Sequence, residues 1–345
     1  MALLIFRTMK PLKTNAELFG EHPSMVDLRK LISRVACSKA RTVLIYGETG
    51  TGKGLVARMV HEESQRSAAA FVDINCAAIP AALLESELFG HEKGAFTGAA
   101  NRKQGLIETA HGGTFFLDEI RELEPVMQAK ILTLLDTRRM RRLGGIRDDE
   151  VDVRFIAATN KILLGEVKAG NFRDDLYYRL QVIAINIPPL RERGDDIFLL
   201  ANNFLAKYNR EYGSKLRHMD AEVKQVFLSY PWPGNVRELE NLIERLCLLE
   251  DGEHIRLEHL PKRILREAQA LPAGGNGTVS RANPDANVFA VVDRDYRLAT
   301  QKFQSELISE AMSACGQNLQ MAAQRLGLSR HALRHQMAKL GLKGC

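Results

Sequence analysis

The sequence has 345 residues, of which 45% are hydrophobic and 26% are charged, with a formal net charge of +6. This composition predicts a soluble, cytoplasmic chain of two or three domains, with one large core and a smaller module. No apolar run reaches the roughly 18 residues of a membrane span, and the first ten residues lack a signal-peptide cleavage site. We therefore expect no membrane segment, and we expect residues 1–17 to be an N-terminal tail.

Cysteine and histidine usage argues against a metal centre. The five cysteines are odd in number and widely scattered, and the nine histidines show no ligand spacing. We expect reduced thiols, with Cys76 in the core, and no structural metal.

The positive charge is concentrated at the C-terminal end. Residues 296–345 hold seven basic and two acidic side chains, a local charge of +5, and the other 295 residues carry +1. A nearly neutral body with a basic end predicts an enzyme core joined to a nucleic-acid reader. Residues 272–287, rich in Gly, Pro, Asn and Ser, predict a flexible linker between the two. The apolar run at residues 288–292 fits a strand, a docking patch or the approach to a helix equally well.

A phosphate-binding loop is predicted at residues 47–54 (GETGTGKG). The preceding run, residues 42–46, is typical of a strand buried on both faces of a parallel sheet, and residues 55–61 continue as a helix. This order places backbone N–H groups at a helix N-terminus, where they bind phosphates, and Lys53 against the β- and γ-phosphates of ATP. The residues expected to bind the nucleotide here are Gly47, Glu48, Thr49, Gly50, Thr51, Gly52, Lys53 and Gly54. Because Gly54 replaces the usual Ser or Thr, we expect Mg²⁺ to depend on water and on Asp118.

Polar residues follow the later apolar runs. Residues 71–75 and 113–117 are predicted strands, and the second leads into Asp118 and Glu119 at the edge where open α/β sheets bind ligands. We expect Asp118 to hold magnesium-bound water and Glu119 to orient and polarise the attacking water. The alternative is an ordinary helix N-cap by Asp118. A fourth strand over residues 151–157 leads to Asn160, whose amide can hydrogen-bond the γ-phosphate or that water.

A glycine-rich hexapeptide lies between the phosphate loop and the carboxylate pair: Gly94, Ala95, Phe96, Thr97, Gly98 and Ala99. Its composition alone is that of a mobile surface turn. Inside a nucleotide-hydrolysing module, a flexible loop with an apolar tip is instead expected to move against a partner. The basic run at residues 138–142 (RRMRR) is typical of a solvated face, with contact to DNA or a protein partner as the alternative.

The remaining helical patterns predict two further modules. Residues 196–212, residues 221–230 and a helix that opens within residues 231–239 predict an α-helical lid with Trp232 in its core. Residues 301–313, 319–326 and 329–340 predict three helices, the last two forming a helix-turn-helix. The residues expected to contact DNA are Ser329, Arg330, His331, Arg334, His335 and Lys339.

In combination these motifs resemble those of the bacterial enhancer-binding proteins, the sigma-54-dependent transcription activators of the AAA+ ATPase class. The resemblance covers residues 18–265 and 301–342 and implies an α/β fold, an AAA+ P-loop NTPase with a parallel sheet and flanking helices, followed by an α-helical lid and a small all-α domain. The implied domains are an N-terminal tail (1–17), an ATPase subdomain that engages sigma-54 (18–190), a lid (191–267), a flexible linker (268–295) and a Fis-type helix-turn-helix (296–345).

The resemblance also implies roles for single residues. Residues 94–99 match the family's sigma-54-engaging loop. Asn75 matches a switch that pairs with the catalytic glutamate, although a satisfied strand-end amide is the alternative. Asn160 matches the first sensor, and Arg237 matches the second sensor, with a surface salt bridge to Glu240 or Glu244 as its alternative.

Two arginines, Arg173 and Arg179, match residues that reach into a neighbour's ATP, where a guanidinium neutralises charge on the transferred phosphoryl group. At least one of them could instead pair with Asp174 or Asp175.

The implied function is that of an ATP-hydrolysing ring, expected to be hexameric, which binds double-stranded enhancer DNA and remodels sigma-54 RNA polymerase from a closed to an open promoter complex. A generic AAA+ remodelling ATPase is disfavoured by the hexapeptide and the basic C-terminal module. A DNA-binding repressor with a vestigial ATPase is disfavoured by Lys53, Asp118, Glu119 and the two arginines. Since only 17 residues precede the ATPase, we expect control from elsewhere, such as a separate inhibitory protein.

Overall fold

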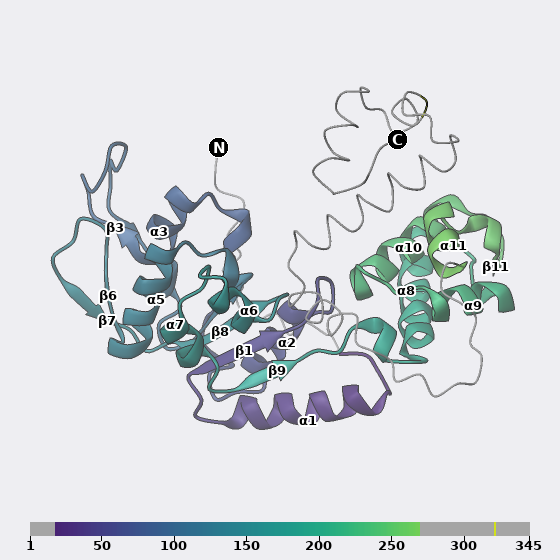
Figure 1. Cartoon of the computed structure of the whole chain (residues 1–345), viewed down its shortest axis with the longest axis horizontal. Helices are drawn as coiled ribbons and strands as arrows, with labels where there is room; N and C mark the ends of the chain where they lie inside the picture. Colours follow the sequence, from purple (N-terminus) through teal and green to yellow (C-terminus); the bar gives the residue numbers. More distant parts are fainter. Residues whose placement is uncertain (1–17, 270–320, 322–345) are drawn as a thin grey trace, which may run out of the picture. The chain divides into compact units, whose positions relative to one another are not determined.

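A computed structural model describes residues 18–269 and the single residue Met321 (Figure 1). The chain divides into two compact units, Met1–Ala273 and Gly274–Cys345. The three helices expected over residues 301–340, the DNA-contacting face among them, lie outside the described residues, as do the tail and the linker from residue 270.

Five parallel strands form the central sheet of the first unit, in the order β2-β5-β8-β1-β9. Their bounds are Thr42–Tyr46 for β1, Phe71–Asn75 for β2, Thr114–Asp118 for β5, Arg154–Thr159 for β8 and Ala184–Asn186 for β9. The α/β class with a parallel sheet is confirmed, and β1 and β2 have the predicted bounds. β5 lies one residue later than predicted, and the short β9 was not predicted.

The start of β8 differs from the prediction because its first residues belong to another structure. Residues 148–150 form the second strand of a hairpin, and the N–H of Val151 still donates to the carbonyl of Arg138 at 2.9 Å. Sheet pairing begins only at Arg154, whose N–H donates to the carbonyl of Gly113 at 3.1 Å. The first residue of this apolar run therefore continues the hairpin, and the run joins the central sheet only from Arg154.

Helices cover both faces of the sheet (Figure 1). One face carries α1 (Pro23–Cys37) and α2 (Lys53–Glu62), and the other carries α3 (Ala81–Phe89), α5 (Pro125–Thr137) and α7 (Asp174–Leu180). Two shorter helices, α4 (Leu106–Thr109) and α6 (Leu163–Lys168), complete this subdomain. The unpredicted α1 has a proline at its first position, where the missing N–H costs nothing.

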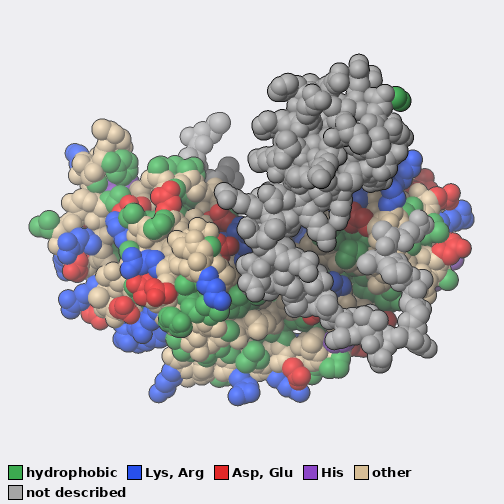
Figure 2. All heavy atoms as spheres, viewed as in Figure 1, with side chains coloured by type: hydrophobic (Ala, Val, Ile, Leu, Met, Phe, Trp, Pro, Cys, Tyr) green, Lys and Arg blue, Asp and Glu red, His purple; other side chains and the backbone are tan. Residues whose placement is uncertain are grey.

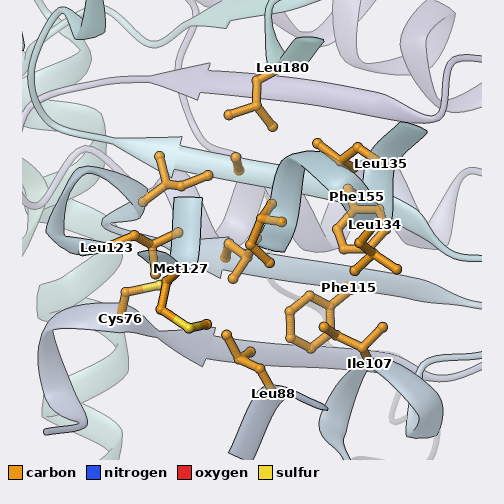
Figure 3. Close-up of a cluster of buried hydrophobic side chains, with 14 of the residues drawn as sticks. Cys76, Leu88, Ile107, Phe115, Leu123, Met127, Leu134, Leu135, Phe155 and Leu180 are labelled. Carbon is orange, nitrogen blue, oxygen red and sulfur yellow. The ribbon is translucent and has the colours of Figure 1, made fainter. Parts of the chain in front are cut away.

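Alternate residues of each strand feed two separate cores. Leu44 of β1 packs with residues of α5 and α7, whereas Val43 and Ile45 pack with α1 and α2. Figure 3 shows the first core, with Phe115 and Phe155 of the sheet beneath helical leucines. Cys76 lies in this core, as predicted. Burial is the main reason why the pKa of its thiol is raised to about 12.

The lid contains α8 (Asp196–Tyr212), α9 (Ala221–Ser229), α10 (Asn235–Leu249) and α11 (Lys262–Gln269), with a two-residue pairing of β10 (His218–Met219) and β11 (His254–Ile255). Trp232 is fully buried in its core, as predicted, and its ring N–H donates to the carbonyl of Phe227 at 2.8 Å. α11 extends past the expected lid boundary at residue 267. Within residues 18–269, no helix combines the length and apolar character needed to cross a membrane.

Two hairpins project from one end of the α/β subdomain (Figure 1). The first joins β3 (Gly90–His91) to β4 (Lys103–Gln104), and the second joins β6 (Arg139–Arg141) to β7 (Asp148–Glu150). The two are linked because the N–H of Leu143 donates to the carbonyl of Gly90 and the N–H of Glu92 donates to the carbonyl of Leu143, both at 3.0 Å. Figure 2 shows basic and acidic side chains intermingled over this end of the subdomain.

Candidate nucleotide-binding site and glycine-rich loop

The loop at residues 47–54 joins β1 to α2, as its sequence predicts. Gly50 and Gly52 have φ values of +82° and +99°, which L side chains rarely adopt, so the glycines are required by the backbone. The Lys53 side chain is only 7% exposed, and its ammonium donates to the carbonyls of Gly47 at 3.0 Å and Glu48 at 3.4 Å. The lysine is therefore held over the loop whose N–H groups open α2.

The backbone at residue 54 does not require a glycine. Gly54 lies in an exposed position of α2, and a Cβ atom there would meet only Phe116, at 3.8 Å. The N–H of Val56 still donates to the carbonyl of Gly52 at 3.1 Å, so the first turn is formed despite the glycine. A hydroxyl or carboxylate would fit here, but this chain offers neither.

Asp118 and Glu119 stand at the carboxyl end of β5. The Glu119 carboxylate lies 3.6 Å from the Lys53 ammonium, and its second oxygen, Oε2, is buried without a hydrogen-bond partner within the described residues. The backbone of Glu119 has φ 51° and ψ 51°, a strained left-handed conformation, and its N–H donates to Asp118 Oδ1 at 3.0 Å. A strained residue with an unused buried acceptor is typical of a functional site rather than of a simple helix cap.

Asn75 ends β2 and Asn160 directly follows β8, so both lie at the carboxyl edge of the sheet, on either side of β5. Asn75 pairs in register with Asp118, but its Oδ1 accepts from the N–H of Ala77 at 2.9 Å, and within residues 18–269 no hydrogen bond joins it to Glu119. This geometry is that of the satisfied strand-end amide. The Asn160 amide donates to Thr49 Oγ1 at 3.3 Å, and its Oδ1 is buried and unpaired among the described residues. Asn160 therefore borders the phosphate loop with a free acceptor.

Arg173 and Arg179 both pair with acids of their own chain. The Arg173 guanidinium donates to both oxygens of Asp175, at 3.0 and 2.7 Å, which confirms that one of the two arginines pairs with a neighbouring aspartate. Arg179 lies 2.9 Å from Asp136 and donates to the carbonyl of Leu135 at 3.0 Å. Both side chains are about half exposed, so each pairing can be exchanged.

Arg237 extends from the first turn of α10 beside the phosphate loop. Its backbone N–H donates to the carbonyl of Gly50 at 3.3 Å, and its side chain is exposed. Over residues 18–269 no carboxylate pairs with this guanidinium, because Glu240 is taken by Lys207 and Glu244 accepts from Tyr212. The surface salt bridge considered as an alternative is absent.

Two lid residues that the sequence did not identify also touch the loop. Arg191 donates to both Glu48 oxygens, at 2.9 and 2.6 Å. Asn235, fully buried with φ +50°, donates to Glu48 Oε2 and to the carbonyl of Thr49, each at 3.1 Å. The one available signal was the Pro-Gly-Asn turn, since asparagine tolerates positive φ.

The hexapeptide at residues 94–99 forms a closed loop at the end of the first hairpin. The N–H of Gly94 donates to the carbonyl of Ala99 at 2.9 Å, and Gly94 and Gly98 have φ values of +82° and +104°. Thr97 is exposed, and the Phe96 side chain is 42% exposed with its ring edge-on to His91 at 5.0 Å. The apolar tip is thus only partly covered by its own chain.

The basic run is a solvated face only in part. Arg138, Arg139 and Arg141 are exposed, but the side chain of Arg142 is only 9% exposed and contacts three carboxylates. Its guanidinium lies 2.7 Å from Glu108, 3.0 Å from Asp149 and 3.3 Å from Glu92. The hydrogen bond to Glu108 is the main reason why the pKa of Arg142 is raised. The prediction was wrong for Arg142 because side chains alternate along a strand, which turns Met140 and Arg142 inward.

The chain matches three known domain families. Residues 18–186 match the sigma-54 interaction domain, residues 191–275 match the AAA+ ATPase lid domain, and residues 301–340 match the bacterial regulatory proteins of the Fis family. These matches follow the order of the modules predicted from the sequence.

Similar proteins and solved structures support these domain matches. The regulatory protein AtoC of Escherichia coli is 43% identical over 93% of this chain and 67% of AtoC, and the response regulator protein PilR of Pseudomonas aeruginosa is 43% identical over 94% and 70%. The nitrogen fixation protein AnfA of Azotobacter vinelandii is 42% identical over 95% of this chain, which spans 58% of AnfA. Crystalline NtrX from Brucella abortus in complex with ATP is 33% identical, with a TM-score of 0.68 over 95% of this chain and 70% of NtrX.

Proposed function

Because the chain belongs to the family of sigma-54-dependent transcription activators of the AAA+ ATPase class, we propose that it hydrolyses ATP and thereby remodels sigma-54 RNA polymerase from the closed to the open promoter complex. The observation that carries this proposal is the closed glycine-rich loop at residues 94–99. It lies in the chain between Asn75 and Asp118, which are register partners at the nucleotide end of the sheet.

In hydrolysis, Lys53 and Glu119 take complementary roles. The Lys53 ammonium and the Glu119 carboxylate lie 3.6 Å apart, so the ammonium can exchange the carboxylate for phosphate oxygens. The freed Glu119 carboxylate then accepts a proton from the attacking water, and its unpaired Oε2 supplies the acceptor. Asn160 orients that water through its free Oδ1, which accepts a hydrogen bond, or the γ-phosphate through its Nδ2, the donor that bonds Thr49. To act as a switch on Glu119, Asn75 must turn its Nδ2 donor toward that carboxylate, because the atom bonded to Ala77 is its Oδ1 acceptor.

The donor set also fits Mg²⁺. Asp118 uses one carboxylate oxygen on the N–H of Glu119 and offers the other, and Mg²⁺ is usually held by one or two carboxylates together with phosphates and water. Asp118 would hold the ion, and Gly54 contributes no ligand. Bound there, the ion would neutralise charge on the phosphates.

Assembly into a hexameric ring is part of the same proposal. Arg173 and Arg179 are both about half exposed and are paired to acids that water can replace. Each guanidinium is then available to a nucleotide bound by an adjacent subunit, where it stabilises charge on the transferred phosphoryl group.

Coupling to the partner runs through the two linked hairpins. Arg142 joins Glu92, which leads into the glycine-rich loop, to Asp149 in β7 and to Glu108 in α4. A shift at the nucleotide edge of β2 or β5 therefore moves a braced unit rather than a single loop. Its partly covered Phe96 is the apolar surface offered to sigma-54, since it lies in the exposed loop within the residues that match the sigma-54 interaction domain.

The C-terminal module supplies the DNA contact in this proposal. Residues 301–340 match the Fis family, and Arg330 and Arg334 are among the basic residues expected on the outer face of the last helix. Binding of double-stranded enhancer DNA would tether the ATPase near the promoter. A separate inhibitory protein remains our hypothesis for control.

The deciding experiment is an open-complex assay on a sigma-54 promoter, with ATP turnover measured on the same preparation. We expect the Thr97→Ala chain to keep most ATPase activity and to lose open-complex formation, because Thr97 is exposed on the loop and makes no contact with Lys53 or Glu119. Lys103→Ala, at the base of the same hairpin, is the control and should keep both activities. Open complexes formed normally by Thr97→Ala would contradict the proposed coupling.

A further inference from the structure

We propose that Glu48, Arg191 and Asn235 form a latch between the phosphate loop and the lid, which positions Arg237 toward the phosphates of a bound nucleotide. We call these three residues the Glu48 latch. The inference rests on the proposed nucleotide site and adds positioning residues to it.

The first part of the latch is an ion pair with fixed geometry. The guanidinium of Arg191, in the segment that leads into the lid, donates to Oε2 and Oε1 of Glu48 at 2.9 and 2.6 Å. This hydrogen bonding is the main reason why the pKa of Glu48 is lowered. Two parallel bonds fix orientation as well as distance, which a single lysine contact would not do.

The second part is the buried amide of Asn235 at the start of α10. Its Oδ1 accepts from the N–H of Leu190 at 2.8 Å, while its Nδ2 donates to Glu48 Oε2 and to the carbonyl of Thr49. One side chain thus ties the start of α10 both to the phosphate loop and to Leu190, the residue that leads into the lid. Its φ of +50° is uncommon for a residue other than glycine, and such strain persists where surrounding contacts fix it.

The backbone of the phosphate loop is in direct contact with that of the lid. A Cβ atom on Gly50 would lie 2.1 Å from the carbonyl oxygen of Gly234 and 3.2 Å from the Cβ of Arg237. The N–H of Arg237 donates to the carbonyl of Gly50 at 3.3 Å. Arg237 follows Asn235 by two residues on the first turn of α10, so a displacement of Asn235 carries Arg237 with it.

The charge of Glu48 supports positioning over nucleotide contact. A carboxylate inside a loop that receives polyphosphate repels its ligand unless a cation neutralises it. Arg191 supplies that cation from the lid, so the loop is electrostatically suited to phosphate only while the lid is engaged. Arg237, which has no carboxylate partner among the described residues, then remains available to the phosphates.

A double-mutant cycle tests the latch in the full-length chain. Affinity is measured by fluorescence with the N-methylanthraniloyl derivative of ATPγS for the wild type, Arg191→Ala, Arg237→Ala and the double variant. Each single change should weaken binding roughly tenfold, and the double variant should also be weakened roughly tenfold, because an unlatched Arg237 contributes little. Additive losses of about a hundredfold would overturn the inference.

Three further variants separate positioning from folding. Glu48→Gln keeps the shape of the side chain and should reproduce the loss, and Arg191→Lys should restore it only in part because it keeps the charge without the two parallel bonds. Lys207→Ala breaks a matched lid ion pair with Glu240 that does not touch the phosphate loop, and it should leave affinity within about twofold. If Glu48→Gln and Arg191→Ala both bind like the wild type, the latch is refuted. If the wild type itself fails to bind ATPγS, the proposed function fails instead.

Discussion

Replacing Arg142 with alanine should loosen both hairpins without disturbing the nucleotide site. Its guanidinium lies within 3.3 Å of three carboxylates: Glu92, which follows β3, Glu108 of α4 and Asp149 of β7. The alanine variant leaves these carboxylates facing one another, with only the exposed Arg102 near Glu92 and the exposed Arg147 near Asp149 as remaining cations. Neither Lys53 nor Glu119 touches this cluster within the described residues.

The size of the effect follows from the burial of the cluster. Removing one partner of a fully buried ion pair costs about 3–5 kcal/mol, because an uncompensated charge remains. Here the carboxylates are 25–37% exposed, so water solvates part of the charge and a local cost of roughly 2–3 kcal/mol is expected. At about 1.4 kcal/mol per factor of ten, the hairpins should open roughly 30 to 150 times more often.

Amide hydrogen exchange measures this opening directly. The N–H groups of Glu92 and Leu143 bridge the two hairpins, so peptides that contain them should exchange roughly 30 to 150 times faster in Arg142→Ala, while peptides from β1 and β5 should not change. The control is Arg141→Ala, which removes an exposed pair with Asp148 and should change little. Unchanged exchange in Arg142→Ala would refute the view that the cluster braces the loop.

Three further outcomes are expected. Glu119→Gln should bind ATP and hydrolyse it at least about a hundredfold more slowly, measured by phosphate release, and wild-type turnover would remove Glu119 from the mechanism. Arg179→Ala mixed with Lys53→Ala should recover part of the ATPase activity that each lacks, whereas a mixture as inactive as its components would argue against action on a neighbour's nucleotide. Burial lowers the pKa of His61 from 6.5 to about 4. The unfolded chain therefore binds a proton that the folded chain does not, and the free energy of unfolding, unaffected above pH 6.5, falls by up to about 3 kcal/mol as the pH drops to 4. Urea denaturation of His61→Leu should lack this slope, and an unchanged slope would exclude His61 as its cause.

The sequence predicted the parts of the site whose signal is local. The phosphate loop, the strand that precedes it and the carboxylate pair occupy short runs in which residue type and order carry the chemistry. The lid helices were predicted for the same reason, since their apolar residues recur at helical spacing. The loop at residues 94–99 was recognised from its composition and position, and its glycines do occupy left-handed backbone conformations.

What could not be predicted depends on partners far apart in the chain. Asn235 and Glu48 are separated by 187 positions, and no sequence pattern predicts the hydrogen bond between them. Arg142 was grouped with its basic neighbours because charge runs usually face solvent, but strand alternation buries it among carboxylates that come from other elements. For Asn75 the sequence left two interpretations, a switch that pairs with Glu119 and a satisfied strand-end amide, and the structure shows the second, with Oδ1 accepting from the N–H of Ala77.

The pairing of Arg173 and Arg179 within their own chain is compatible with action on a neighbour's nucleotide. Both ion pairs are about half exposed, so solvent screens them and their loss costs little. A nucleotide at a subunit boundary presents several negative charges away from water, where a planar guanidinium binds more strongly than it does to an exposed carboxylate. In the proposed ring, Asp175 and Asp136 would hold the arginines before assembly and release them to the neighbour's nucleotide. On this argument, Asp175→Asn should leave ring-dependent hydrolysis largely intact, whereas Arg173→Ala should abolish most of it; equal losses in both would mean that the ion pair itself is what the site requires.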